Sequence, residues 1–191
     1  MNRCPWAGSD LMIRYHDTEW GVFTLDDIAQ FEHLSLEVFQ AGLSWETILK
    51  KRETLRRLFA DFDPEIVARF DEARVQEILK DRGGIRNERK IRAVINNAVR
   101  ILEIREKQGG PFGRFLFESF GGEVKINSFK KMEELPPKTA VSEYLSIKLK
   151  KLGFNFVGPT TIYAHLQAVG FVNDHIVDCF RWREVQAVYP K

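Results

Sequence analysis

Apolar residues recur at helical intervals along most of the chain, and no segment sustains the alternation of apolar and polar positions that is typical of a strand. The clearest series runs from Ile28 to Ala41, where apolar side chains return every three or four positions. Asp26 and Asp27 stand where a helix N-cap is favoured, and Gly42 stands where a helix commonly ends. The pattern therefore predicts an all-α fold.

The same criteria predict further helices, separated by short breaks at glycine and proline. Pairs of these residues make the segment 121–138 the least regular, and we expect it to be an exposed excursion between two helical halves. We expect one compact helical domain over residues 1–191, with two helical lobes and a hairpin near 152–159 as an alternative. The predicted helices cover 45–59, a short stretch from Pro64, 73–79, 87–107, 139–151, 159–169 and 174–180.

The composition is that of an ordinary globular protein, since 44% of the 191 residues are hydrophobic and 29% are charged. These fractions exclude a disordered, collagenous or low-complexity chain. The longest apolar runs are too short to span a bilayer, and the first residues lack the apolar stretch of a signal peptide. We therefore expect a cytoplasmic protein without a membrane partner, and we expect it to act as a monomer.

The net charge is only +2, so any surface for nucleic acid has to be local. Gly153 and Gly158 bracket a short apolar turn between two predicted helices, and Lys150 precedes it. Glycines let the backbone approach another molecule, and the start of the following helix offers free amides to an anion. Such a turn could clamp a DNA phosphate without contacting base edges. The alternative is a plain helical hairpin whose glycines only end and begin helices.

The two cysteines of the chain each have a histidine at short range, which suggests two pairs of metal ligands. His175 and Cys179 are four residues apart, and on one helix this spacing places them on the same face. Cys4 and His16 form the second pair, near the N-terminus. Two thiolates and two imidazoles suit a tetrahedral structural Zn²⁺ with no position left for water. The alternative is two buried thiols and two incidental histidines.

Aromatic residues gather near the N-terminus, where Trp6, Tyr15, Trp20 and Trp45 lie within 45 residues. Glu37 lies among them, near the end of an apolar predicted helix, where a carboxylate is desolvated unless it is paired or reaches a pocket. Flat aromatic walls and one carboxylate suit a planar cationic heterocycle. The alternative is that the tryptophans are core residues and Glu37 points to water.

Five distinctive segments occur along the chain: Arg3–Trp6, Tyr15–Asp17 with Glu19–Val22, Gln40–Trp45, Gly153–Gly158 and Val172–His175. Together they closely resemble the bacterial DNA-3-methyladenine glycosylase I family, in the family's order and from Arg3 to about Cys179. The resemblance implies an all-helical member of the helix-hairpin-helix glycosylase superfamily that carries a structural zinc. It also implies an enzyme that excises N3-methyladenine from alkylated double-stranded DNA, releases free 3-methyladenine and leaves an abasic site.

Carried over position by position, the resemblance assigns roles to residues of this chain. The carboxylate that recognises the base, and the one residue that we assign to catalysis, is Glu37. Tyr15 and Trp45 are implied as stacking aromatics, with Trp6 and Trp20 near the pocket. The implied zinc ligands are Cys4, His16, His175 and Cys179, and we expect DNA contacts from Lys150, Gly153, Phe154 and Gly158.

The chain departs from the family pattern at one position and from the wider superfamily at another. Met12 stands where the family has a second pocket tyrosine, and a thioether cannot donate the hydrogen bond of a phenol. Asn173 stands where most of the superfamily has an aspartate that assists departure of the base. The adjacent Asp174 would point about 100° away on a helix. We expect it to cap the helix or to orient His175.

The substrate makes the missing aspartate tolerable, because N3-methylated adenine is cationic and its bond to deoxyribose is already weak. We expect the enzyme to flip the nucleotide, select the cationic base by stacking and by Glu37, and admit water.

Two other classes of function stay open from the sequence alone. A non-catalytic DNA-binding module would need the hairpin and zinc without the pocket, and a zinc hydrolase would need an open coordination position.

Overall fold

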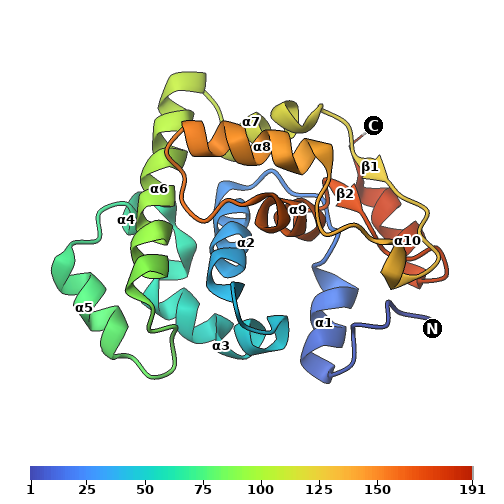
Figure 1. Cartoon of the computed structure of the whole chain (residues 1–191), viewed down its shortest axis with the longest axis horizontal. Helices are drawn as coiled ribbons and strands as arrows, with labels where there is room; N and C mark the ends of the chain where they lie inside the picture. Colours follow the sequence, from blue (N-terminus) through green and yellow to red (C-terminus); the bar gives the residue numbers. More distant parts are fainter. Residues whose placement is uncertain (191) are drawn as a thin grey trace.

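The computed structural model describes residues 1–190 and is mostly helical, with two short strands among these residues (Figure 1). No helix in this range combines the length and the hydrophobicity needed to cross a membrane. The elements are α1 (Asp10–Thr18), α2 (Asp27–Gln40), α3 (Trp45–Leu58), η1 (Ala60–Phe62), α4 (Pro64–Val67), α5 (Glu72–Lys80), α6 (Glu88–Gln108), α7 (Phe112–Phe120), β1 (Lys125–Ile126), η2 (Met132–Glu134), α8 (Ala140–Lys151), α9 (Pro159–Ala168), β2 (Val172–Asn173), α10 (Phe180–Glu184) and η3 (Val185–Val188), where η marks a 3₁₀ helix.

Most predicted helix boundaries are confirmed, because the expected caps form. The Asp26 carboxylate accepts a hydrogen bond from the amide of Ala29 at 2.8 Å, and α2 begins one residue after Asp26. Asp71 caps α5 in the same way. At the other end, α6 stops at Gly109, whose φ of +67° is a left-handed conformation that glycine adopts without strain.

Helix α2 lies at the centre of the molecule, with α3, α6, α7 and α9 packed around it (Figure 1). Its residues from Gln30 to Phe39 are all buried, so the helix has no solvent face over these positions. Buried polar groups need partners. Glu32 has two, since Arg52 and Arg56 donate to it at 2.8 and 2.7 Å.

The hydrophobic residues form two clusters. The main core lies between α2, α3 and α6–α9, and the second cluster joins α1 to residues near both ends of the chain, including Cys4 and Cys179. The amide of Phe180 donates to the carbonyl of Asn2 at 3.1 Å, which ties the N-terminal segment to the start of α10. Trp45 packs against both clusters and therefore stands at their junction.

The helix predicted over 174–180 is wrong. Residues 174–179 form turns after β2, and α10 begins only at Phe180. The backbone of this segment is used in tertiary contacts, since β2 pairs in parallel with β1 and the amide of Val177 donates to the carbonyl of Phe129 at 2.9 Å. Helices α1 and α7 and the two strands were not predicted.

The irregular segment 121–138 is mostly exposed, as expected, but it is not a free excursion. It contributes β1 to the parallel pair, and Met132 in η2 packs against the second cluster. The segment therefore returns to the body of the molecule.

Candidate functional site

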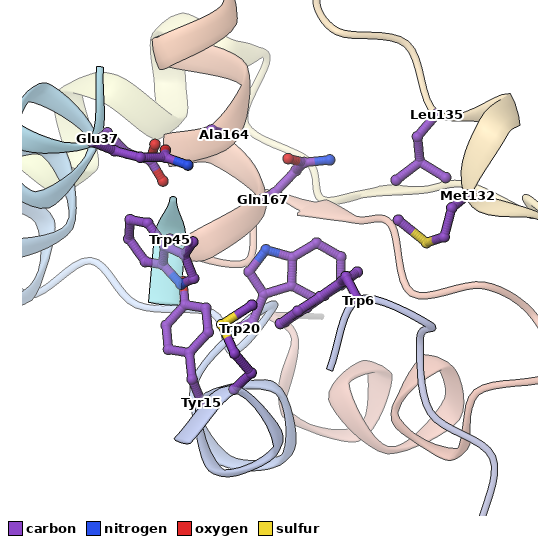
Figure 2. Close-up of a pocket in the computed structure, with 11 residues that line it drawn as sticks. Trp6, Tyr15, Trp20, Glu37, Trp45, Met132, Leu135, Ala164 and Gln167 are labelled. Atoms are coloured by element: carbon purple, nitrogen blue, oxygen red, sulfur yellow. The ribbon is translucent and has the colours of Figure 1, made fainter. Parts of the chain in front are cut away.

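A cavity of about 260 Å³ opens where α1, α2, α3, α9 and η2 meet, and Trp45, at the junction of the two hydrophobic clusters, lines it. Figure 2 shows its wall, in which aromatic side chains face a carboxylate and an amide. The lining residues are Trp6, Met12, Tyr15, Trp20, Glu37, Gln40, Trp45, Met132, Leu135, Ala164 and Gln167.

The four aromatic residues singled out in the sequence all line this cavity. The ring centroids of Tyr15 and Trp45 are 5.3 Å apart, and those of Trp6 and Trp20 are 5.1 Å apart at nearly perpendicular planes. Trp6 and Tyr15, at 6.3 Å, connect the two pairs. The four rings pack against one another and all border the cavity, and aromatic walls of this kind suit a planar ligand.

Glu37 projects from α2 toward the same cavity (Figure 2). Its side chain is buried, and within residues 1–190 the carboxyl makes no hydrogen bond or ion pair with another protein group. Burial raises the pKa of Glu37 to about 8. In the same helix Glu32 is held by two arginines, which counter the effect of burial and lower its pKa. Glu37 is therefore a buried carboxyl whose hydrogen-bonding capacity faces a ligand space.

No positive charge next to Glu37 on α2 offsets this burial. His33 lies one turn before it, and burial lowers the pKa of His33 to about 4, so the imidazole is neutral at physiological pH. His165 is also buried, with Nε2 at 2.9 Å from the Gln30 side-chain oxygen, and burial lowers its pKa to about 3. A cation that enters the cavity meets the carboxyl without a competing cation.

Lys90 supports the end of α2, a role that the sequence did not suggest because the residue lies in a run of basic residues. Its ammonium is buried and donates to the carbonyls of Phe39 and Ala41 at 2.8 and 2.6 Å. Cations favour the negative end of a helix, where carbonyls lack partners. The contact holds the turn that connects Glu37 in α2 to Trp45 in α3.

Cys4, His16, His175 and Cys179 meet in a second site, hereafter the Cys/His cluster. All four side chains are buried, and their ligand atoms lie within 4.8 Å of one another. Cys179 Sγ is 3.4 Å from His16 Nε2 and 3.6 Å from His175 Nδ1. Hydrogen bonds from Cys4, His16 and His175 hold the pKa of the Cys179 thiol well below its usual range. The cluster could hold a metal ion.

The second nitrogen of each imidazole is held by a neighbouring group, as is usual for metal-ligating histidines. His16 Nδ1 is 2.8 Å from the carboxylate of Asp17, and His175 Nε2 is 3.0 Å from the carbonyl of Trp20. Gly21 makes room for the second contact, since a Cβ there would lie 3.0 Å from His175 Nε2 and its φ is +82°. The His175 and Cys179 pair was predicted through a shared helix, but a turn brings the two side chains together instead.

The hairpin between α8 and α9 has the backbone that the glycine spacing suggested. Gly153 has a φ of +88°, and Asn97 on α6 pairs with both the amide and the carbonyl of Asn155. Within residues 1–190, the amides of Phe156 and Gly158 donate to no other protein group. Lys150, in the last turn of α8, is exposed. Free amides thus gather at the start of α9.

Phe154 differs from its prediction as a DNA contact. Its side chain is 3% exposed and stacks on Phe112 with ring centroids 5.7 Å apart, while its amide donates to the carbonyl of Leu149. Phe154 therefore supports the hairpin from the core, because an apolar ring is most stable when it is buried.

A family model described as methyladenine glycosylase matches residues 6–182 of the chain. The chain belongs to this family. DNA-3-methyladenine glycosylase 1 of Escherichia coli (strain K12) is 45% identical over 180 residues, which cover 94% of this chain and 96% of that protein. A crystal structure of 3-methyladenine DNA glycosylase I superposes with a TM-score of 0.90 at 43% identity, covering 94% of this chain and 98% of that one.

A third related structure has a bound base. It is a tyrosine-to-phenylalanine variant of 3-methyladenine DNA glycosylase I in complex with 3-methyladenine, with a TM-score of 0.90 and 32% identity. The match covers 100% of this chain and 99% of that one.

The structure also shows the surroundings of Asn173 and Asp174. The Asn173 amide donates to the carbonyl of Trp182 at 3.0 Å, and its oxygen accepts from the amide of His175, so the side chain serves the backbone. Asp174 neither caps a helix nor orients His175, contrary to expectation. It accepts hydrogen bonds from Tyr163, Gln167 and Asn127, because the predicted helix is absent and its carboxylate turns inward.

Sequence reasoning missed part of the methyladenine glycosylase cavity. Gln40 belongs to a segment that was recognised but was given no role, and nothing near Gln167 or Met132 marked them as site residues. The spacing of Ala164 and Gln167 on one helix face was a usable signal only once α9 was known to border the cavity. The missed residues are Gln40, Met132, Leu135, Ala164 and Gln167.

Proposed function

We propose that the cavity at Glu37 is the base-binding site with which this chain, a DNA-3-methyladenine glycosylase, excises N3-methyladenine from alkylated DNA. The observation that carries the proposal is the unpaired, buried carboxyl of Glu37 opposite aromatic walls. A related structure of the same fold is described in complex with 3-methyladenine. The nucleotide must leave the duplex to reach such a cavity, at a cost of a few kcal/mol in stacking and pairing.

Charge selects the damaged base. A neutral adenine gains little from a carboxyl whose pKa is about 8, because the group is mostly protonated at pH 7. A cationic base lowers that pKa by direct attraction, so the carboxylate forms when the correct base arrives. Tyr15 and Trp45 add stacking, worth about 1–3 kcal/mol per base in aromatic sites. The flipped state is therefore populated for methylated adenine and not for normal adenine.

Hydrolysis then needs little acid catalysis. The bond between C1′ and N9 breaks with its electron pair moving to the base, which leaves as neutral 3-methyladenine. Water adds to C1′, loses a proton to solvent and leaves an abasic site. Asn173 is occupied with backbone groups, and this suits a reaction whose leaving group already carries a positive charge. The chain's contribution is extrusion, selection and orientation of the nucleotide.

The hairpin serves as the DNA clamp in this proposal. The free amides of Phe156 and Gly158 and the ammonium of Lys150 suit phosphate oxygens, and the start of α9 adds the positive end of a helix dipole. These contacts position the duplex without reading its sequence.

The Cys/His cluster is proposed to hold one structural Zn²⁺. With Zn–S of about 2.3 Å and Zn–N of about 2.0–2.1 Å, a tetrahedral site has ligand separations of roughly 3.3–3.8 Å. The separations of 3.4 and 3.6 Å between Cys179 Sγ and the two imidazole nitrogens fit this range. Four protein ligands leave no position for a reactive water, so a hydrolytic zinc is not favoured.

The test is single-turnover release of 3-methyladenine from methylated duplex DNA, measured together with duplex binding. Glu37→Gln should lower the release rate by one to three orders of magnitude, since a desolvated charge-assisted contact is worth about 1.5–3 kcal/mol or somewhat more. Trp45→Ala should also lower it, through lost stacking. Duplex affinity should barely change in either variant.

The matched control is Glu77→Gln, which removes an exposed carboxylate on α5 that, within residues 1–190, pairs only with Arg74. It should excise at the wild-type rate. Wild-type excision by the Glu37→Gln variant would assign base selection to other residues, and wild-type protein that binds DNA but releases no base would make the chain a binding module.

A further inference from the structure

The carboxylate of Asp174 is buried, at 1% exposure, and is fully used inside the protein. Three donors from different segments converge on it: the hydroxyl of Tyr163, the side-chain amide of Gln167 at 2.7 Å and that of Asn127 at 2.7 Å. Burial and this hydrogen bond raise the pKa of Tyr163 far above its ordinary value, so its hydroxyl stays a donor. Of the three donors, only Gln167 also lines the base cavity.

This contact decides which way the Gln167 amide faces. A carboxylate can only accept hydrogen bonds, so the NH₂ group of Gln167 must point to Asp174. The amide oxygen is then left for the cavity, and within residues 1–190 it accepts from no protein group. In Figure 2 the oxygen of Gln167 lies on the side of the amide nearer Glu37, and the nitrogen lies on the far side. By holding the NH₂ group of Gln167, Asp174 leaves the Gln167 oxygen as a second acceptor for the ligand, in addition to Glu37.

Adenine methylated at N3 offers one hydrogen-bond donor group to such a site. Its ring nitrogens N1 and N7 are acceptors, and only the exocyclic amine at C6 carries N–H bonds. That amine has two hydrogens, and Glu37 and the oxygen of Gln167 are two acceptors that line the cavity. The side-chain amide of Gln40 lines the cavity too, but within residues 1–190 no protein group bonds to it, so it can turn either its oxygen or its NH₂ group to a ligand. A 6-oxo purine places an acceptor at the same position, where it would face two acceptors and lose its hydrogen bonds to water.

We infer that Gln167, oriented by Asp174, is a specificity residue that accepts a hydrogen bond from the exocyclic amine and rejects 6-oxo purines such as 3-methylguanine. Asp174 is a positioning residue in this arrangement, because it acts through Gln167. The inference rests on the proposed base-binding site and adds to it the reason for a 6-amino purine. Charge alone does not supply that reason, since 3-methylguanine in DNA is also cationic.

The experiment compares single-turnover release of 3-methyladenine and 3-methylguanine from the same methylated duplex, with thermal unfolding as a check on folding. Gln167→Met removes the acceptor and nearly keeps the volume. It should lower the ratio of the two rates, adenine over guanine, about tenfold, as one hydrogen bond of about 1.4 kcal/mol predicts. Asp174→Asn allows the amide of Gln167 to rotate and present NH₂, and it should lower the ratio by at least as much.

The ratio separates selection from damage to the fold, because a partly unfolded enzyme loses both activities together. The matched control is Gln186→Met, which removes a side-chain amide that donates to the carbonyl of Trp182 and does not line the cavity. Its ratio should stay within about twofold of the wild type. Equal loss of both activities in Gln167→Met would overturn the inference, whatever the stability of Asp174→Asn. Failure of the wild type to release 3-methyladenine would instead overturn the proposed function.

Discussion

Two buried carboxyl groups on the same helix show how one residue type is used in two ways. Glu32 is neutralised by Arg52 and Arg56, and its contribution is structural. Glu37 has no such partner and borders a cavity. A buried carboxyl without a partner costs stability, so its persistence points to a ligand that supplies the missing interaction.

The raised pKa of Glu37 predicts an acid limb in the pH profile of excision. In the free enzyme the group is about 1% ionised at pH 6 and mostly ionised above its pKa of about 8. The value of kcat/KM for 3-methyladenine release should therefore rise up to about tenfold per pH unit from pH 6 and level off near pH 8. Glu37→Gln should give a flat profile over this range, and a wild-type profile that is equally flat would contradict the assignment.

The same shift affects stability, which offers an independent measurement at this residue. A carboxyl whose pKa is higher in the folded state than in the unfolded state stabilises the fold less as pH rises through the interval between the two values. Between pH 6 and 8 the free energy of unfolding of the wild type should fall by about 2 kcal/mol relative to Glu37→Gln. Urea unfolding of the two proteins at both pH values measures this difference.

At the scale of elements, the hairpin between α8 and α9 depends on these two flanking helices and also on α6, which is distant from it in the sequence. Asn96 and Asn97 of α6 donate to the carbonyls of Gly153 and Asn155, and this fixes the turn from the side. Helix α9 then extends from the hairpin to the base cavity, where it contributes Ala164 and Gln167. One helix thus connects the proposed phosphate clamp at its start to the base site near its end.

Gly158 allows a clean test of the clamp. A Cβ at this position would meet no protein atom within 4 Å, and φ is −65°, so the fold tolerates a side chain. Gly158→Phe should weaken binding to every duplex by about tenfold, because the ring blocks the approach of a phosphate to the free amides. Gly110→Phe is the control, since a Cβ there also meets open space.

For Gly158→Phe we expect a loss of binding affinity that is similar for all DNA sequences. Titration of several duplexes at one salt concentration measures it. A change of sequence preference, or equal losses for Gly158→Phe and Gly110→Phe, would argue against a backbone clamp at this hairpin.

At the scale of the whole molecule, the Cys/His cluster connects positions 171 residues apart in the pair Cys4 and His175. Chain termini tend to fray unless they are tied down. Here the N-terminal segment contributes Trp6 to the cavity wall, so the order of that wall depends on how firmly the Cys/His cluster holds this segment. A metal in the cluster would therefore contribute to stability and, through Trp6, to the shape of the base site.

We predict one Zn²⁺ per chain by elemental analysis and a large loss of stability when a ligand is removed. Cys179→Ser should cost at least about 3 kcal/mol, or a fall of about 6–12 °C in Tm for a chain of this size. A chelator should lower the Tm of the wild type toward that of the variant and leave the variant unchanged. Metal-free protein with wild-type stability would contradict the prediction.

Local patterns were sufficient for much of the fold and for the chemistry of the site. The cap at Asp26, and the helix ends that Asp71 and Gly109 form, were predictable because capping depends on a few neighbouring residues. The segment 174–179 was not, because its backbone and side chains bond to partners more than 40 residues away, such as Asn127. Long-range hydrogen bonds can override a helical spacing of apolar residues.

The sequence by itself determined the mostly helical architecture, the family, and the residue types of the pocket and the Cys/His cluster, since periodicity, capping and motifs are properties of short segments. Only the tertiary structure decided that Glu37 is unpaired while Glu32 is paired, and that Lys90 is buried against the end of α2. It also decided that Asp174 turns the oxygen of Gln167 toward the base. Pairing, desolvation and the orientation of an amide depend on which distant segments come together, and no local pattern contains that information.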